Sequence, residues 1–343
     1  KSYLKEAKTA SLYLIAKSYK LNASYQEQYN SVSLSGNTEI IFFKAYKQTV
    51  LTHSLIDYTC SSTQLSGMSK NAFEAYLFTD GKPLALTSLN KSDLPKIVKK
   101  STGDVLSITD LLKVRDKRLI QTIDTAVFYS GRVFTRFDVG MAMTSSTGYG
   151  VSKYDNSTIP VSFRNQTSSN YTCAPLFWLA VIYLQYAEAS AELADSGGET
   201  ITQSDLDKSI NLLKDRAGLP HLAIGAILSD PANNHNVSDL LWEIRRERRC
   251  ELMFDNWTRY WDLIRWHQLD KLDTKTYPDI VMGANVSVDP AAPTNSQITL
   301  KGNYLDVSRG MSRTFDKRYY SYPIPTGQIT LNPQLSQNKG WEE

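Results

Sequence analysis

The chain has 343 residues, of which 41% are hydrophobic and 21% charged, so it can bury a sizeable core as one large domain or two modest ones. Its 38 basic and 35 acidic residues leave a net charge of only +3, and this balance argues against a general polyanion binder. The longest apolar run, residues 174–184, is too short to cross a bilayer.

The first part of the chain combines one helical pattern with a long polar stretch. Residues 3–20 carry apolar side chains at helical spacing, which predicts an amphipathic helix. Residues 39–46, EIIFFKAY, follow as a dense apolar run. From about residue 47 to 170, Ser, Thr, Asn, Gly and Tyr dominate and periodic segments are short. This composition predicts a loop-rich surface region, where binding residues tend to lie.

Helical patterns return after residue 173. Residues 174–195 predict a helix that ends at the glycines of the SGG sequence. A second helix is expected to begin at Ser204 as its N-cap, with Asp207 three positions later, and to end at Gly218. The two helices predict a hairpin of the kind from which tetratricopeptide arrays are built.

Two further helices and an irregular end complete the prediction. Residues 238–254 and 258–272 have helical spacing. In the second of these, three apolar side chains fall on one stripe and are expected to pack as core, namely Trp257, Trp261 and Ile264. After Pro278 the chain becomes irregular, and residues 322–341 predict an extended tail laid over the domain.

The predicted helix over residues 238–254 contains the arginine-rich sequence RRERR. At 100° per residue, one face of this helix carries Leu241, Ile244, Arg248 and Leu252. A guanidinium within an apolar stripe needs acidic or carbonyl partners, because an unpaired buried charge costs several kcal/mol. Nearby carboxylates are available from Glu251, Asp255 and Asp262. We therefore expect an internal ion network that fixes how the last two helices meet.

Two other interpretations of this helix are weaker. A nucleic-acid-binding helix would expose its arginines on one face with few acids between them, whereas here the acids are interleaved. Glu247 and Glu251 could serve as general acid and base in a carbohydrate-active enzyme. The favoured alternative is a pair of i,i+4 salt bridges within the helix, because neighbouring arginines would keep both carboxylates ionised. The sequence also lacks GxSxG, HExxH, P-loop and GxGxxG motifs, so no enzymatic activity is predicted.

Metal and disulfide chemistry receive little support. The four histidines show no HxxxH or HxxE spacing, so no protein-built transition-metal site is expected, while a structural metal stays open. No cofactor is expected either. Cys60, Cys173 and Cys250 lie far apart and form no disulfide framework. A Cys60–Cys173 bridge and unpaired thiols both stay open.

Seven stretches of the sequence, in the correct order, resemble motifs of the SusD/RagB-like nutrient-binding lipoproteins of Bacteroidetes outer membranes. They are NTEIIFF (37–43), RDKRL (115–119), YTCAPLFWLAVIYLQYAEASAEL (171–193), INLLKDRAGLP (210–220), ERRCEL (247–252), RYWDLIRW (259–266) and YSYPIPTGQITLNPQLSQNKGW (320–341). Each motif alone is weak, but seven in order are specific. The pattern departs from the family at Lys117, at Trp178 and Val181, and in the turn at 255–258. The departures at Trp178 and Val181 put one internal ion pair of the family in doubt.

The resemblance implies a mostly α fold, SusD-like, with tetratricopeptide-like helix pairs and a large loop-rich region. It implies a single domain over 1–343 that lacks its N-terminal part. Its expected segments are helical (1–36), loop-rich and ligand-facing (37–172), helical scaffold (173–275) and irregular C-terminal tail (276–343). The missing N-terminal part is expected to hold a signal peptide, a lipid-modified cysteine and the first helical repeats.

The function that the resemblance implies is non-catalytic capture of an extracellular nutrient at the outer membrane. The ligand would be a glycan or oligosaccharide, with a peptide also open, and the partner a TonB-dependent SusC-like transporter. The membrane would be reached only through an N-terminal lipid anchor, and no nucleic acid is expected. The alternative from the helical pattern is a tetratricopeptide-type protein–protein interaction scaffold.

Candidate ligand-binding residues lie in the loop after the EIIFF run. Sugar rings stack on aromatic side chains while polar groups bind the hydroxyls. The loop supplies both kinds of group in Tyr46, His53, Asp57 and Tyr58. The alternative is that these tyrosines only cover local core. Residues 144–158, with Tyr149 and Tyr154, are a second and weaker candidate zone.

Overall fold

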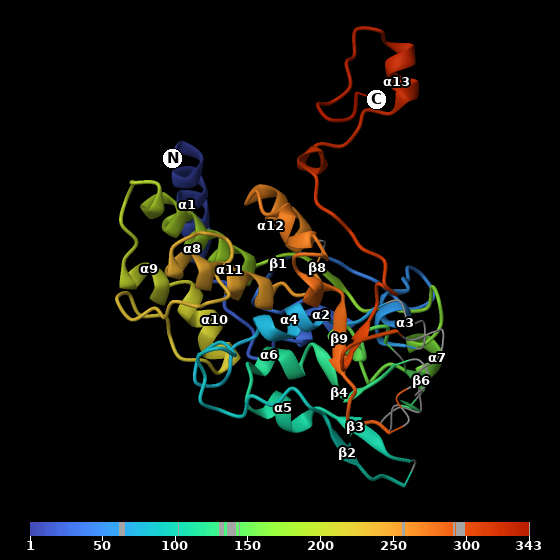
Figure 1. Ribbon diagram of the computed structural model, residues 1–343. Helices are drawn as coiled ribbons and strands as arrows, with labels where there is room; N and C mark the ends of the chain where they lie inside the picture. The colour runs from blue at the N-terminus through green and yellow to red at the C-terminus, as the bar shows by residue number, and fades with distance from the viewer. Residues whose placement is uncertain are drawn as a thin grey trace.

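The computed structural model divides the chain into a helical half and a half built of short strands and long loops (Figure 1). It describes all residues except 62–65, 102, 130–133, 136–141, 144, 256–257, 291, 293–298 and 343, and only the backbone of 134–135 and 142–143. Among the described residues, no helix combines the length and apolar character that a bilayer span requires. The predicted mostly helical architecture is confirmed.

Helix α8 is the central element of the helical half. It contacts α1 and α11, and the short helices α9 and α10 pack beside it. These helices are α1 (Ser2–Ile15), α8 (Leu179–Asp195), α9 (Gln203–Asp207), α10 (Ile210–Ala217) and α11 (Asp239–Glu251). Small side chains on α8, Ala187 and Ala191, face Leu241 and Ile244 of α11 in one buried cluster. The absence of long side chains on this face of α8 lets α11 approach closely.

Strand β8 (Ala174–Trp178) occupies the start of the segment predicted as a helix over 174–195. It pairs antiparallel with β1 (Ile40–Lys44), so the helical prediction is wrong for its first five residues. Pairing with a strand about 130 positions earlier outweighs the local helical pattern. Trp178 ends β8 and lies edge-on to the ring of Tyr29, 6.0 Å away between centroids. An apolar contact therefore stands where the family motif has arginine.

Helix α9 begins two residues earlier than predicted. Its N-cap is Thr202, whose hydroxyl accepts from the backbone N–H of Asp205 while the Asp205 carboxylate accepts from Thr202. This capping box has the predicted residue types and spacing, shifted from Ser204 and Asp207. The helix breaks at 208–209 before α10, which ends at Gly218 with a φ of 70°, as predicted.

Short elements make up the loop-rich half. A four-stranded sheet has the order β2-β3-β4-β7, and β10-β11-β9 form a second sheet. The strands are β2 (Lys96–Val98), β3 (Val105–Ser107), β4 (Ile123–Val127), β5 (Phe134–Thr135), β6 (Ala142–Met143), β7 (Tyr149–Val151), β9 (Met282–Asn285), β10 (Thr299–Lys301) and β11 (Tyr304–Asp306). The helices are α2 (Glu27–Asn30), α3 (Leu55–Cys60), α4 (Lys70–Ala75), α5 (Thr109–Lys113), α6 (Lys117–Ile120) and α7 (Val161–Arg164).

Helices α11 and α12 (Thr258–Arg265) match the two helices expected from the arginine-rich stretch. Ser238 caps α11 by accepting from the backbone N–H of Leu241. The second predicted helix is shorter than expected, because His267 has a φ of 53° and a 3₁₀ turn, η1 (Leu269–Leu272), follows. Trp261 is 55% exposed, so its assignment to the core is wrong. Trp257 lies outside the described residues.

The ion pair between Arg248 and Asp262 joins α11 to α12. The Nε atom of Arg248 lies 2.8 Å from Oδ2 of Asp262, and the Arg248 side chain is 11% exposed. Of the three expected acids, only Asp262 pairs with Arg248; Glu251 and Asp255 bind other cations. The expected ionic link between the two helices is confirmed with this single partner.

Replacing Arg248 with alanine should lower the free energy of unfolding by about 1–3 kcal/mol, because Asp262 loses a nearly buried partner. The loss is limited because Arg265 still donates to Asp262 over 2.9 Å. Urea unfolding followed by circular dichroism measures the change. An Arg248→Ala protein with unaltered stability would show that this pair does not fix the helix junction.

The C-terminal tail does not lie over the domain as expected. Figure 1 shows the tail projecting from the body and carrying α13 (Thr326–Leu331). The tail follows the 3₁₀ turn η3 (Lys317–Tyr320), whereas the turn η2 (Pro278–Ile280) lies earlier, before β9. Side chains of the tail form hydrogen bonds with its own backbone. The Gln337 amide accepts from the N–H of Ile324 and donates to its carbonyl, and Nε1 of Trp341 donates to the carbonyl of Arg318. These local bonds order the tail and do not involve the surface of the domain. Tyr322 bonds the hydroxyl of Tyr260 on α12.

Candidate functional site

The loop that leads from β1 to α3 is fixed by backbone pairing with residues near β8. His53 and Asn170 exchange two backbone hydrogen bonds of 2.8 and 2.9 Å. The fully buried Asn170 side chain accepts from the N–H groups of Ile56 and Asp57 at the start of α3 (Leu55–Cys60). Lys47 and Leu51 bridge a tight turn between them. These bonds tie the loop to the segment before β8.

Tyr46 and His53 lie against each other in this loop. Their ring centroids are 4.6 Å apart and their planes meet at 76°. Nδ1 of His53 accepts from the N–H of Leu55, so Nε2 carries the proton and donates to the carbonyl of Thr172, 2.9 Å away. Burial lowers the pKa of His53 below its usual value, which keeps the ring neutral at pH 7. The pair forms a partly exposed aromatic contact, and the ammonium of Lys44 lies 5.2 Å from the centroid of the Tyr46 ring.

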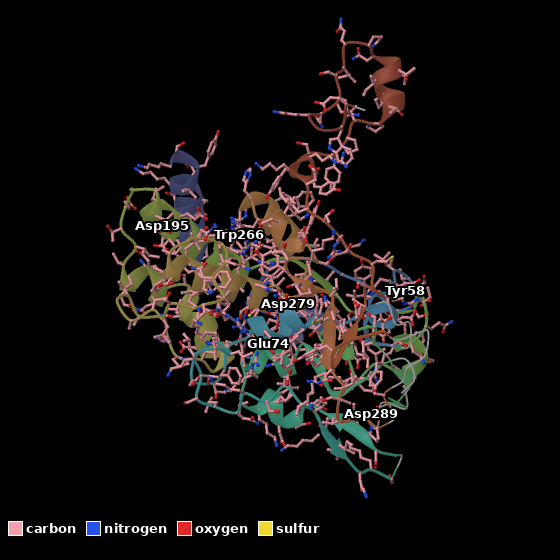
Figure 2. The ribbon with its side chains drawn as sticks, in the orientation of Figure 1. Tyr58, Glu74, Asp195, Trp266, Asp279 and Asp289 are labelled. Atoms are coloured by element: carbon pink, nitrogen blue, oxygen red, sulfur yellow. The ribbon has the colours of Figure 1, made fainter. Side chains whose placement is uncertain are left out.

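Asp57 and Tyr58 are separated by the geometry of α3. Asp57 is 6% exposed and accepts from the Thr167 hydroxyl over 2.8 Å, so it ties the loop to the following segment. Tyr58 is 44% exposed and lies at the edge of the molecule (Figure 2). The structure therefore brings Tyr46 and His53 together, leaves Tyr58 accessible and turns Asp57 inward.

Large apolar side chains are exposed on and beside this loop. They are Phe42, Val50, Leu51, Leu55, Tyr58 and Leu176, from β1, the loop, α3 and β8. Sequence reasoning missed the aliphatic members, because an apolar side chain in a loop gives no sign of its exposure. By contrast, Tyr149 and Tyr154 are buried, and Tyr149 stacks on Phe73 at 4.8 Å. The two tyrosines that made residues 144–158 a candidate zone are therefore core, although Ser146, Ser157 and Thr158 of the same zone are exposed.

A buried ion network connects four stretches that are far apart in the sequence. Arg118, 1% exposed, bonds Asp116 over 2.6 Å, Glu251 over 2.8 Å and also Glu247. Lys214 lies 3.3 Å from Glu247. Arg216 bonds Glu251 and, over 2.7 Å, Glu39. The charged residues of NTEIIFF, RDKRL, INLLKDRAGLP and ERRCEL thus meet at one place in the core.

Glu247 and Glu251 are structural carboxylates. Both are buried, and their partners come from α6 and α10 rather than from one turn away on α11. The expected i,i+4 bridges within the helix are therefore wrong, although the expected pairing with cations is confirmed. Burial would raise the pKa of Glu247, but Arg118 and Lys214 hold it at about 2. A carboxylate held ionised in this way cannot act as a general acid near neutral pH.

Glu39 responds to pH in the opposite direction. Burial raises its pKa to about 7, only partly offset by Arg216. A carboxyl group whose pKa is higher in the folded than in the unfolded protein contributes stability when it is protonated. This contribution is fully present at pH values below the unfolded-state pKa of 4.5 and is lost as the pH rises through the folded-state pKa of about 7. The wild type should lose about 2–3 kcal/mol of stability from this group between pH 5 and pH 8.

Glu39→Gln should flatten that dependence, because the amide does not titrate. Urea unfolding at pH 5, 6, 7 and 8 tests this, with Glu27→Gln as a control at another glutamate of the same region. Glu247 does not affect this window, since its share is lost only as the pH falls below 4.5 toward 2. His53 and His235 have lowered pKa values and make the stability rise with pH up to about 6.5, but they do so in wild type and variant alike, so the difference between the two slopes isolates Glu39. Equal slopes for wild type and Glu39→Gln would contradict the assignment.

The described residues contain no group of three or more His, Cys, Asp and Glu side chains that could hold a metal ion. The three cysteines are buried thiols, and no disulfide joins Cys60 to Cys173. Burial raises the pKa of Cys250 to about 12, so this thiol stays protonated.

Comparison with known proteins identifies a family. The sequence model of the SusD family matches residues 38–341. No curated protein is similar enough in sequence to match. A SusD-like carbohydrate binding protein from Bacteroides fragilis has a TM-score of 0.67 and 24% identity over 96% of this chain and 61% of its own. A second SusD-like protein from the same organism has a TM-score of 0.61 and 21% identity over 98% of this chain and 62% of its own.

The surface glycan-binding protein A of Bacteroides uniformis is also similar, with a TM-score of 0.50 and 18% identity over 98% of this chain and 60% of its own. This chain therefore spans about three fifths of the length of these solved structures. At these identities the likeness establishes the fold.

Proposed function

Because this chain belongs to the SusD family through residues 38–341, we propose that it captures an extracellular glycan and delivers it unchanged to a TonB-dependent outer-membrane transporter. The protein acts at the cell surface, held to the outer membrane by an N-terminal lipid anchor. Its ligand is a glycan or oligosaccharide. Two similar structures, one of a carbohydrate binding protein and one of a surface glycan-binding protein, support this class of ligand.

The observation that carries the proposal is the aromatic surface of the β1–α3 loop. Tyr46 and His53 form a partly exposed aromatic contact, and Tyr58 is accessible beside exposed apolar side chains. A sugar ring buries its apolar face against such a surface at little entropic cost, because Asn170 already ties the loop to the segment before β8. Asp57 holds the loop through Thr167 rather than contacting the ligand.

The buried state of the paired carboxylates supports binding without catalysis. A glycosidase needs two accessible carboxyl groups flanking the scissile bond. Glu247 and Glu251, the pair that the sequence offers for this chemistry, are bound to Arg118 inside the core. The arginine-rich helices therefore serve as a frame, and recognition is assigned to the loop.

A glycan array probed with the purified protein tests this function. We expect retention of one structural class of glycan, recovered without cleavage after prolonged incubation. Copurification with a TonB-dependent transporter from outer membranes tests the delivery step. Retention of peptides but no glycan would contradict the ligand class, and release of shortened oligosaccharides would contradict the absence of catalysis.

A further inference from the structure

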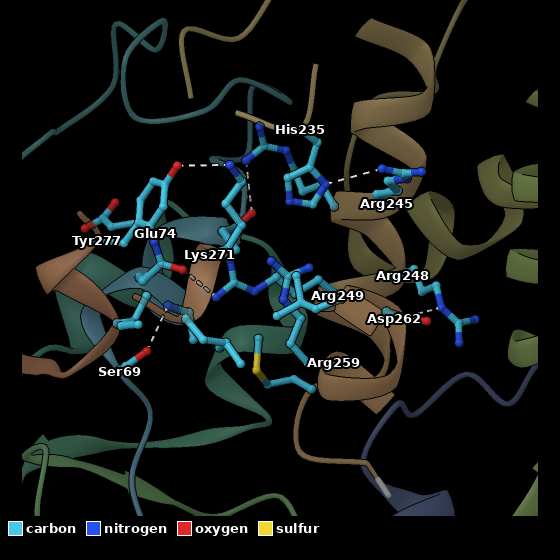
Figure 3. A pocket seen from close by; sticks show the side chains of 18 of the residues that line it. Ser69, Glu74, His235, Arg245, Arg248, Arg249, Arg259, Asp262, Lys271 and Tyr277 are labelled. Atoms are coloured by element: carbon cyan, nitrogen blue, oxygen red, sulfur yellow. Dashed lines mark hydrogen bonds and ion pairs between the residues drawn. The ribbon is translucent and has the colours of Figure 1, made fainter. Parts of the chain in front are cut away.

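A large cavity lies between α4, α11, α12 and the turns near residues 271–280, on the helical side of the protein (Figure 3). Its volume is about 940 Å³, within the range of sites for small molecules. Basic side chains outnumber acidic ones in its lining. Six of them are Arg245, Arg246, Arg248, Arg249, Arg259 and Lys271. The lining does not include the residues of the β1–α3 loop.

Four of these cations already have carboxylate partners. Arg245 bonds Glu192 over 2.7 Å, and Arg246 bonds Asp230 and Glu243. Arg248 bonds Asp262, and Lys271 bonds Asp270 over 2.9 Å. These pairs explain why four basic groups are stable at the cavity wall.

Arg249 and Arg259 lack such partners among the residues that the structure describes. Arg249 donates to the amide oxygen of Asn71 over 2.7 Å, a neutral acceptor. Arg259 makes no hydrogen bond or ion pair within the described ranges, and its guanidinium lies 5.8 Å from the ring centroid of Trp266. Figure 3 shows the two arginines beside each other at the cavity. Both are partly buried, so water screens their mutual repulsion incompletely.

The local field of the cavity is positive. Burial together with Arg249 lowers the pKa of Arg259 to about 9. Burial, Arg259 and Arg245 lower the pKa of His235, on the same wall, to about 3. Within the described part of the chain, neither arginine has an ion-pair partner, and their charges help to keep the neighbouring His235 neutral, so the positive charge at the cavity is only partly balanced.

The described acids at the cavity form no ion pair with Arg249 or Arg259; the charges of Asp279 and Asp262 only partly offset the lowered pKa values of Arg249 and Arg259, respectively. Asp255 bonds Lys153, Asp262 bonds Arg248, and Asp279 accepts from the amide of Asn71. Glu74 lies 3.7 Å from Arg115. Each acid is directed to another group. An external anion is the group that would complete the environment of the two arginines.

We propose that this cavity binds an oxyanion, a sulfate or a carboxylate, between the guanidinium groups of Arg249 and Arg259. Planar guanidinium groups bind such oxygens in pairs, with charge-assisted hydrogen bonds. The cavity is larger than a bare anion, so the group can be carried by a saccharide. The site is distinct from the β1–α3 loop: Figure 2 places Glu74 and Asp279 of the cavity near the centre and Tyr58 at the edge. It does not depend on the function proposed for that loop.

Titration calorimetry tests the site at constant ionic strength set with chloride. The probes are sodium sulfate, a digalacturonate and the neutral disaccharide maltose. We expect binding of sulfate or digalacturonate and none of maltose at this site. Tighter binding of digalacturonate than of sulfate identifies the sugar-borne acid as the source, and the reverse identifies the free anion.

Arg249→Gln and Arg259→Gln should each weaken the anion about tenfold or more, because each removes one charge-assisted contact. Arg259→Lys should retain part of the affinity. Arg309→Gln, at an exposed arginine outside the cavity lining, should bind as the wild type does. If the arginines only stabilised the fold, replacing them would lower the melting temperature of the protein measured without anion. We expect Arg259→Gln to leave this melting temperature unchanged or to raise it. Absence of binding by wild type, or unaltered affinity in the Arg249→Gln/Arg259→Gln double variant, overturns the proposal.

Discussion

Replacing Arg118 with methionine should lower the free energy of unfolding by about 3–5 kcal/mol, because it removes a buried charge that bonds three buried acids. The guanidinium is 1% exposed and bonds three carboxylates, those of Asp116, Glu247 and Glu251. Methionine fills much of the volume but leaves three buried acids short of a partner. Urea unfolding at pH 7 measures the loss.

Arg265→Met is the matched control for this experiment. Arg265 also bonds two acids, Glu188 and Asp262, but its side chain is 46% exposed. Water screens these pairs, so we expect a cost of about 1 kcal/mol or less. If Arg118→Met cost no more than Arg265→Met, the buried network would not be the frame that joins the four motifs.

Tyr58→Ala should weaken glycan binding about tenfold or more while changing the stability by less than about 1 kcal/mol. The side chain is 44% exposed, so its removal leaves no large cavity. Its expected contribution is the stacking area that it offers to a sugar ring. Affinity electrophoresis in gels containing the glycan selected on the array measures retention, and thermal unfolding measures stability.

Tyr3→Ala provides a control at another exposed tyrosine, 89% accessible and on α1 in the helical half. It should migrate as the wild type does in the same gels. Equal retention of Tyr58→Ala and Tyr3→Ala would remove Tyr58 from the site. It would then direct attention to Tyr46 and His53, whose rings face each other in the same loop.

Local signals in the sequence located most helices of the scaffold. Ser238 caps α11 and Gly218 ends α10 as predicted, because capping depends on residues within one turn. Strand β8 was not predicted, because its conformation depends on pairing with β1. The sheet of β9, β10 and β11 was missed for a similar reason: its strands are three or four residues long and too short to show a period.

A helical wheel could not predict which residue lies at the centre of the ion network. The wheel correctly placed Arg248 near an apolar stripe, but the arginine at the centre of the network is Arg118, 1% exposed and about 130 positions earlier. The RDKRL motif was the available signal, since a charged motif with apolar neighbours needs partners elsewhere in the chain. The sequence also could not predict that Arg249 and Arg259 form no ion pair with a described carboxylate. Every arginine of the stretch has an acid within a few positions of the sequence.

In the loop, the sequence identified residue types but not their orientation. Tyr46, His53, Asp57 and Tyr58 lie within 13 positions, yet a single helical turn exposes Tyr58 and buries Asp57. The attachment of the loop to the segment before β8 depends on Asn170, more than 100 positions later. No local pattern links that residue to the loop.

The central claim is that the ion network of Arg118, Glu247 and Glu251 forms an internal frame and that the β1–α3 loop binds the glycan. A crystal structure of the protein with a bound oligosaccharide tests it most directly. We predict sugar rings against Tyr46 and Tyr58, with Glu247 and Glu251 still bonded to Arg118 in the core. Sugar in contact with Glu247 or Glu251, or an Arg118 guanidinium open to solvent, would contradict the account.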